Sequence, residues 1–137
     1  MKKTKVLFMI FCVCSLVLEA LPYGAVCRFA TPEETYTETF SYFSLVPYGY
    51  ANFGPFITAI MTCLLFIFAV LLFTSVGRKV IGAARIVSII SVVASLLPLM
   101  FGIYYFNVVS LAISLLMFIQ FIVIIKIKRE FLNNETQ

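Results

Sequence analysis

The chain has 137 residues, of which 63% are hydrophobic and only 12% are charged, about half the charged share of a typical soluble domain. This composition excludes a soluble globular fold for most of the length. We therefore predict an all-α integral membrane protein with four transmembrane helices in an antiparallel bundle, forming a single domain over residues 1–137. The net charge of +4 comes from cations beside apolar segments, which argues against nucleic acid as a partner.

The first predicted crossing covers residues 6–26. Three lysines precede an apolar run at 6–18, a beginning that a secretory signal peptide shares. Small residues should precede a cleavage site, but a cut after Ala25 would have Tyr23 at the third position before it. We therefore expect the helix to be retained, and to bend or end near Pro22, which lacks a backbone N–H.

Glu19 is the candidate functional residue of this crossing. If Val6 marks the inner edge of the hydrocarbon, Glu19 lies ~20 Å inside a layer ~30 Å thick. An ionised carboxylate at that depth is costly, so it should be protonated, hydrogen-bonded or paired with a cation. Pro22 leaves a free carbonyl nearby, and Arg28 is a better cation partner than Arg85, which lies only ~8 Å from the inner edge.

The outer segment, residues 27–52, begins with Thr31-Pro32-Glu33-Glu34, which is typical of a helix start. Aromatic residues then recur at helical spacing, at Tyr36, Phe40 and Phe43. The pattern predicts a short amphipathic extracytoplasmic helix at 32–44, with Tyr36 and Phe40 as candidate contacts for lipid or a partner. The threonines and aromatics also favour strands, so a hairpin is the competing interpretation.

Three further crossings are predicted from the apolar segments that follow. They cover residues 55–76, 80–104 and 108–125, and a cytoplasmic tail follows at 126–137. Pro98 should kink the third crossing. Every cation except Arg28 then lies on one side of the membrane, which predicts a multi-pass cell membrane protein with both termini in the cytoplasm.

Small and hydroxyl side chains mark the helix faces expected to pack together. In the third crossing they are Ala84, Ser88, Ser91, Ser95 and Gly102. In the fourth they are Asn107, Ser110 and Ser114, beside Met117; in the second they are Thr58 and Thr62. Such hydroxyls usually bond to their own helix, so these faces are interpreted as packing seams rather than a substrate path.

No catalytic or metal-binding pattern is recognisable. The chain has no histidine, and its four cysteines are spread over separate segments, so no disulfide, metal site or cofactor is predicted. Val26 disfavours a lipoprotein signal at Cys27. We therefore do not expect an enzyme.

Two function classes remain. The first is an interaction, accessory or immunity-type membrane protein, whose outer segment meets a membrane protein partner or another copy of the chain. The alternative is a small transporter or channel component that uses Glu19 as a proton or cation site. The first is favoured, because an isolated glutamate without a second buried charge makes a poor transport path.

Overall fold

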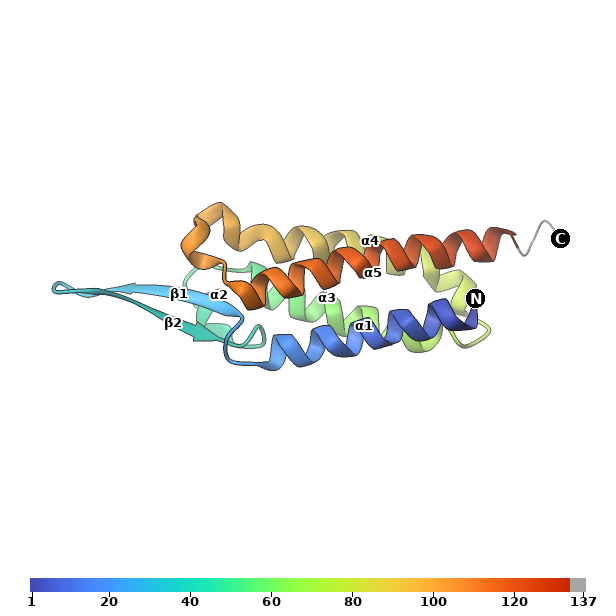
Figure 1. Ribbon diagram of the computed structural model, residues 1–137, viewed down its shortest axis with the longest axis horizontal. Coiled ribbons are helices and arrows are strands. Elements are labelled where there is room, and N and C mark those ends of the chain that lie inside the picture. Colours follow the sequence, from blue (N-terminus) through green and yellow to red (C-terminus); the bar gives the residue numbers. More distant parts are fainter. Residues whose placement is uncertain (134–137) are drawn as a thin grey trace.

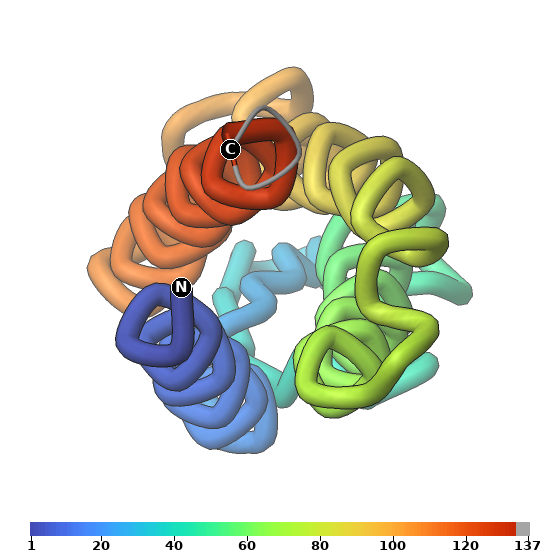
Figure 2. Tube along the Cα trace, turned by 90° about the vertical axis from the view of Figure 1, so that its right-hand side faces the viewer, coloured from blue at the N-terminus to red at the C-terminus, as the bar shows by residue number. Residues whose placement is uncertain are grey.

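The computed structural model describes residues 1–133 and is mostly helical. Four long helices pack side by side around a common centre (Figures 1 and 2). They are α1 (Lys2–Ala20), α3 (Gly54–Leu71), α4 (Gly77–Leu96) and α5 (Val108–Asn133). α1 packs against α3 and α5, and α4 also packs against both, so the helices form a closed ring. We call this ring the helical body.

Three stretches within the described residues are long and apolar enough to cross a membrane: Gly54–Leu71, Gly77–Phe101 and Val108–Asn133. This supports a multi-pass membrane protein. α1 is as long as α3, but its 19 residues include three lysines near its beginning and Glu19 near its end. It is not among the three stretches apolar enough to cross a membrane by composition.

The predicted helix at 32–44 is wrong, and so is the all-α class, because the chain forms a β-hairpin here. Strand β1 (Ala25–Ala30) pairs antiparallel with β2 (Thr35–Phe40). The Thr31-Pro32-Glu33-Glu34 motif is the hairpin turn: the Thr31 N–H donates to the Glu34 carbonyl at 2.8 Å, and the Glu34 N–H donates to Thr31 Oγ1 at 3.1 Å. Threonine and proline occur in turns as well as at helix starts. The threonines and aromatic residues beside this motif have high strand propensity, which favours the turn.

The hairpin projects from one end of the helical body, and the start of α1 and the end of α5 lie at the opposite end (Figure 1). Its base is anchored, because Ala25, Val26 and Cys27 are buried, whereas β2 is exposed except at Phe40. The short helix α2 (Leu45–Gly49) follows, and the Asn52 side chain donates to the Val26 carbonyl at 3.5 Å. We call the two ends of the helical body the hairpin end and the terminal end.

The predicted third crossing changes helix type before its end. α4 stops at Leu96, and the 3-10 helix η1 (Leu97–Phe101) begins beside Pro98, because proline cannot supply the N–H that α-helical bonding requires there. Gly102 lies outside α4 with φ 125°, so it does not belong to the small-residue face assigned to it. The 3-10 helix η2 (Ile103–Tyr105) completes the connection.

The other two long helices also differ from their predicted bounds. α3 ends at Leu71, whereas α5 continues past Ile125 to Asn133, so part of the predicted tail is helical; residues 134–137 lie outside the described part. Contacts between helices hold the terminal end together. Thr4 Oγ1 donates to Glu130 at 2.8 Å, and Lys5 Nζ donates to the Leu72 carbonyl beyond the last turn of α3.

Candidate functional site

A layer of buried polar side chains crosses the helical body toward its hairpin end. Glu19 on α1 and Thr62 on α3 are both 0% exposed, and Thr62 Oγ1 lies 2.7 Å from Glu19 Oε1. Met117 on α5 lies beside them, since its Sδ atom is 3.7 Å from Thr62 Oγ1 and accepts a hydrogen bond from Ser91 on α4 at 2.7 Å. We call Glu19, Thr62, Ser91 and Met117 the Glu19 layer, to which each long helix contributes one residue.

The Thr62 hydroxyl has a second acceptor within reach. Its Oγ1 lies 2.9 Å from the carbonyl oxygen of Thr58, one turn earlier, and Thr58 donates in the same way to Gly54 at 2.7 Å. Hydroxyls in helices commonly bond to the carbonyl four residues before them. The other carboxyl oxygen of Glu19, Oε2, is buried and has no hydrogen-bond partner among the described residues.

The end of α1 fixes the position of Glu19. Pro22 disfavours helical backbone at the residue before it, and Leu21 is extended, with φ −67° and ψ 141°. The helix therefore ends at Ala20, near Pro22 as predicted. The Tyr42 N–H donates to the Glu19 carbonyl at 2.9 Å, which satisfies one of the acceptors left open at a helix end.

Tyr42 connects the hairpin to the Glu19 layer. It follows β2, is 0% exposed, and packs so closely on Gly24 that a Cβ atom there would lie 2.9 Å from its ring. Burial raises the pKa of the Tyr42 phenol to about 12, and the charge of Glu19 also acts on it. Its hydroxyl lies beside Ser110 but meets no hydrogen-bond partner in the described part of the chain.

Ser110 links this region to the start of α5. Its Oγ atom lies 2.6 Å from the Gly24 carbonyl and 3.1 Å from Asn107 Oδ1. Asn107 also accepts from the Ser110 backbone N–H at 2.8 Å, the geometry of a helix N-cap. Because Asn107 is only partly buried, these contacts run from the molecular surface to the interior.

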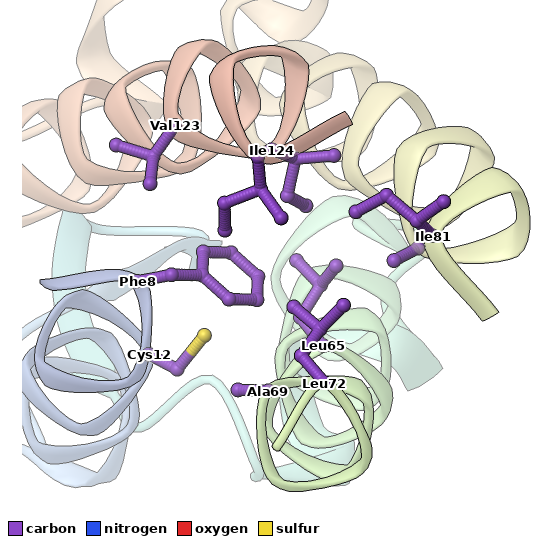
Figure 3. Close-up of a cluster of buried hydrophobic side chains, with 10 residues drawn as sticks. Phe8, Cys12, Leu65, Ala69, Leu72, Ile81, Val123 and Ile124 are labelled. Atoms are coloured by element: carbon purple, nitrogen blue, oxygen red, sulfur yellow. The ribbon is translucent and has the colours of Figure 1, made fainter. Parts of the chain in front are cut away.

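A second polar group lies at mid-height between α1 and α5. Gln120 Nε2 donates to Ser15 Oγ at 2.7 Å and to the Phe11 carbonyl at 3.2 Å, and Cys12 donates to Gln120 Oε1 at 3.6 Å. Beyond it, the interior toward the terminal end is filled by apolar side chains (Figure 3). The members of this apolar cluster are Phe8, Cys12, Leu65, Ala69, Leu72, Ile81, Ala84, Val123, Ile124 and Ile127.

The hairpin carries two different faces. On one face, Phe29 stacks on Tyr36 with ring centres 5.4 Å apart and meets Tyr50 edge-on at 5.0 Å. On the other, Arg28 lies over the Tyr104 ring at 5.6 Å and donates to Thr35 at 3.4 Å. We call the first the aromatic face and the second the Arg28 face.

The predicted site residues divide between these regions. Glu19 lies in the buried layer, while Pro22 is exposed beyond the end of α1. Tyr36 and Phe40 belong to the aromatic face. Arg28 contacts Thr35 and Tyr104 rather than Glu19, and Arg85 is exposed on the outer surface of α4. Neither arginine neutralises the buried carboxyl.

Sequence reasoning identified some of the remaining site residues only as packing positions. The predicted faces of small residues are buried, including Thr62, Ser91 and Met117. Their convergence on Glu19 was missed, because helical spacing says which residues share a face but not which faces meet. Tyr42 was also missed: it lay within the predicted interfacial helix, and no sequence signal connected it to Glu19.

The described residues contain no group of three histidine, cysteine or acidic side chains that could hold a metal ion. What the Glu19 layer can do chemically is accept, hold and donate hydrogen bonds and protons. No protein-family profile, curated protein or solved structure matches the chain.

Proposed function

We propose that this chain is a four-crossing membrane protein that presents its β-hairpin to a protein partner outside the cytoplasm. In this proposal α1 is the fourth crossing, the long helices run antiparallel, and both termini are cytoplasmic. The distribution of cations supports this orientation, because Arg28 on the hairpin is the exception to an otherwise one-sided charge bias.

The observation that carries the proposal is the contrast between the two halves of the hairpin. The base packs on the helical body, whereas the outer half projects beyond it with both faces open (Figure 1). Tyr36 on the aromatic face is 46% exposed and Tyr50 is 66% exposed. A two-stranded hairpin is only marginally stable alone in water, and exposed aromatic residues are enriched where proteins bind one another.

Crosslinking from the aromatic face tests this function. A photoreactive phenylalanine analogue replaces Tyr36 in the full-length tagged protein in its native membrane, and the matched control replaces Val17, which is 58% exposed on α1. We expect a discrete adduct with another protein from position 36 only. An absence of adducts from position 36, or the same adducts from both positions, would contradict the proposal.

The alternative is a small transporter or channel component that uses Glu19. It is supported by the enclosed carboxyl with one unpartnered oxygen, since ionisable groups inside membrane proteins are commonly functional. The apolar cluster between the Glu19 layer and the terminal end weighs against it, because a transport path must reach both sides. Proton or cation flux through proteoliposomes that contain the purified chain would favour this alternative.

A further inference from the structure

Polar and apolar side chains are separated along the axis of the helical body. On α3, Thr58 and Thr62 lie toward the hairpin end, and Leu65, Ala69 and Leu72 follow toward the terminal end. The buried hydroxyls of α4 and α5 toward the hairpin end are Ser88, Ser91, Ser95, Ser110 and Ser114. α1 has buried polar residues at both ends, with Glu19 toward the hairpin end and Thr4 and Lys5 at the terminal end. The apolar cluster lies between Glu19 and this terminal polar group.

The contacts of the Thr62 hydroxyl favour a proton on Glu19. Its Oγ1 lies 2.7 Å from Glu19 Oε1 and 2.9 Å from the Thr58 carbonyl, and both of those oxygens are acceptors when Glu19 is ionised. A hydroxyl has a single hydrogen to donate. If that hydrogen goes to Thr58, as in the equivalent bond from Thr58 to Gly54, the close contact with Glu19 needs a proton from the carboxyl.

Two buried oxygen atoms near this contact have no partner. Glu19 Oε2 and the Tyr42 hydroxyl are both without a hydrogen bond in the described structure. An enclosed carboxylate that lacks a cation is strongly destabilising, and the ion pair among the described acidic residues joins Glu130, not Glu19, to the amino terminus. A proton on the Glu19 carboxyl removes this buried charge.

We infer that Glu19 is a proton-binding site that exchanges with the hairpin end of the helical body. Binding forms one O–H bond on the carboxylate, which becomes a carboxylic acid, and the hydronium ion that gives up this proton becomes water; the reverse sequence releases the proton. The hydroxyls of Tyr42 and Ser110 lie on the hairpin side of Glu19, whereas the apolar cluster lies on the other side.

The surroundings favour a proton over a metal cation. An alkali cation needs several oxygen ligands, whereas the Glu19 layer offers two further hydroxyls, on Thr62 and Ser91, and the Ser91 hydroxyl donates to the Met117 thioether. The titratable groups that interact electrostatically with Glu19 are Cys12 on α1, Cys63 on α3 and Tyr42. α4 and α5 contribute Ser91 and Met117 to the layer, which carry no charge. The inference does not rest on the proposed hairpin partner.

Infrared spectroscopy of the purified full-length protein at neutral pH tests the site. All six acidic residues are glutamates, so labelling with carbon-13 glutamate identifies their carbonyl bands without any substitution. We expect one band of a protonated carboxylic acid in the labelled wild-type protein, its loss in Glu19→Gln, and its retention in Glu38→Gln on the exposed strand β2. A folded wild-type protein with only ionised carboxylate bands would overturn the inference.

Hydrogen–deuterium exchange of the same band tests from which end the proton of Glu19 exchanges. Tyr42→Phe removes a hydroxyl on the hairpin side of Glu19, whereas Ser15→Ala removes one on the side of the apolar cluster. We expect a changed exchange rate of the Glu19 band in Tyr42→Phe and an unchanged rate in Ser15→Ala. Unchanged exchange in Tyr42→Phe, or equal changes in both variants, would contradict exchange with the hairpin end.

Discussion

Thr62 Oγ1 on α3 lies 2.7 Å from Glu19 Oε1 on α1, and this contact joins α1 to the first of the three stretches long and apolar enough to cross a membrane. Both residues are fully enclosed. In this surrounding a hydrogen bond has no water to compete with it, and loss of either partner leaves a buried polar group unsatisfied. The contact therefore bears on both stability and proton binding.

We expect Thr62→Val to lower the free energy of unfolding by about 1–3 kcal/mol, because Glu19 then lacks its hydroxyl partner. Valine keeps the shape of threonine, so packing changes little. Thr62→Ser retains the hydroxyl and should lose less stability. Denaturant unfolding in detergent, followed by circular dichroism, measures both variants; a loss in Thr62→Ser with none in Thr62→Val would show that the methyl group matters and the hydroxyl does not.

Gly24 provides a test of the packing between the hairpin base and Tyr42. A Cβ atom at this position would meet the Tyr42 ring at 2.9 Å, and the ring is fully enclosed. We expect Gly24→Ala to cost about 1–3 kcal/mol of stability, the usual effect of overpacking. The melting temperature in detergent is the measurement.

Gly82 is the matched control, because a Cβ atom there meets nothing within 4 Å. It lies within α4, where alanine is favoured over glycine by roughly 0.5–1 kcal/mol. Gly82→Ala should therefore raise the melting temperature slightly. If the two variants behaved alike, the close packing of Tyr42 on Gly24 would not contribute to stability.

The sequence predicted the helix faces better than the connections between helices. Ser88, Ser91 and Ser95 were recognised as a packing seam from their spacing alone, and all three are buried. The hairpin was only the competing interpretation of residues 32–44, because Thr31 and Pro32 favour a turn as well as a helix start. Tertiary structure decides whether this motif forms a turn or starts a helix, because β2 forms only where β1 lies beside it.

The pairing of Glu19 illustrates the same limit. The depth of Glu19 in the hydrocarbon layer predicts that its carboxyl needs a proton, a hydrogen bond or a cation. Distance along the helix axis favours Arg28 as that cation. The structure instead directs Arg28 toward Tyr104, on the Arg28 face of the hairpin. Axial position along a helix does not determine the direction in which a following strand leaves it.

Substitutions at Phe40 and Glu38 test which side of strand β2 anchors the hairpin to the helical body. Phe40 packs against the buried cluster that contains Ala25 and Tyr42, whereas Glu38 is exposed on the same strand. We expect Phe40→Glu to lower folded yield and thermal stability markedly, because it buries a charge among apolar groups. Glu38→Gln should leave both within error. Limited proteolysis of the hairpin measures the change, and similar cleavage in both variants would mean that Phe40 does not anchor it.

The last prediction concerns membrane topology, and cysteine labelling measures it. The native Cys27 is a poor probe although it lies on the hairpin, because it is 3% exposed and burial raises the pKa of its thiol. Only the thiolate reacts readily, so the wild-type protein should label weakly. Glu33→Cys places a thiol in the exposed hairpin turn instead, and Lys79→Cys places one near the start of α4 at the terminal end.

A membrane-impermeant maleimide added to intact cells should label Glu33→Cys strongly and Lys79→Cys only after the membrane is permeabilised. The physical reason is the charge bias: cations next to apolar segments are retained in the cytoplasm, and Lys79 belongs to such a group whereas the hairpin turn is acidic. The reverse pattern would invert the proposed orientation. Labelling of both sites from outside would be incompatible with α3 as a crossing, since α3 alone separates the hairpin from the start of α4.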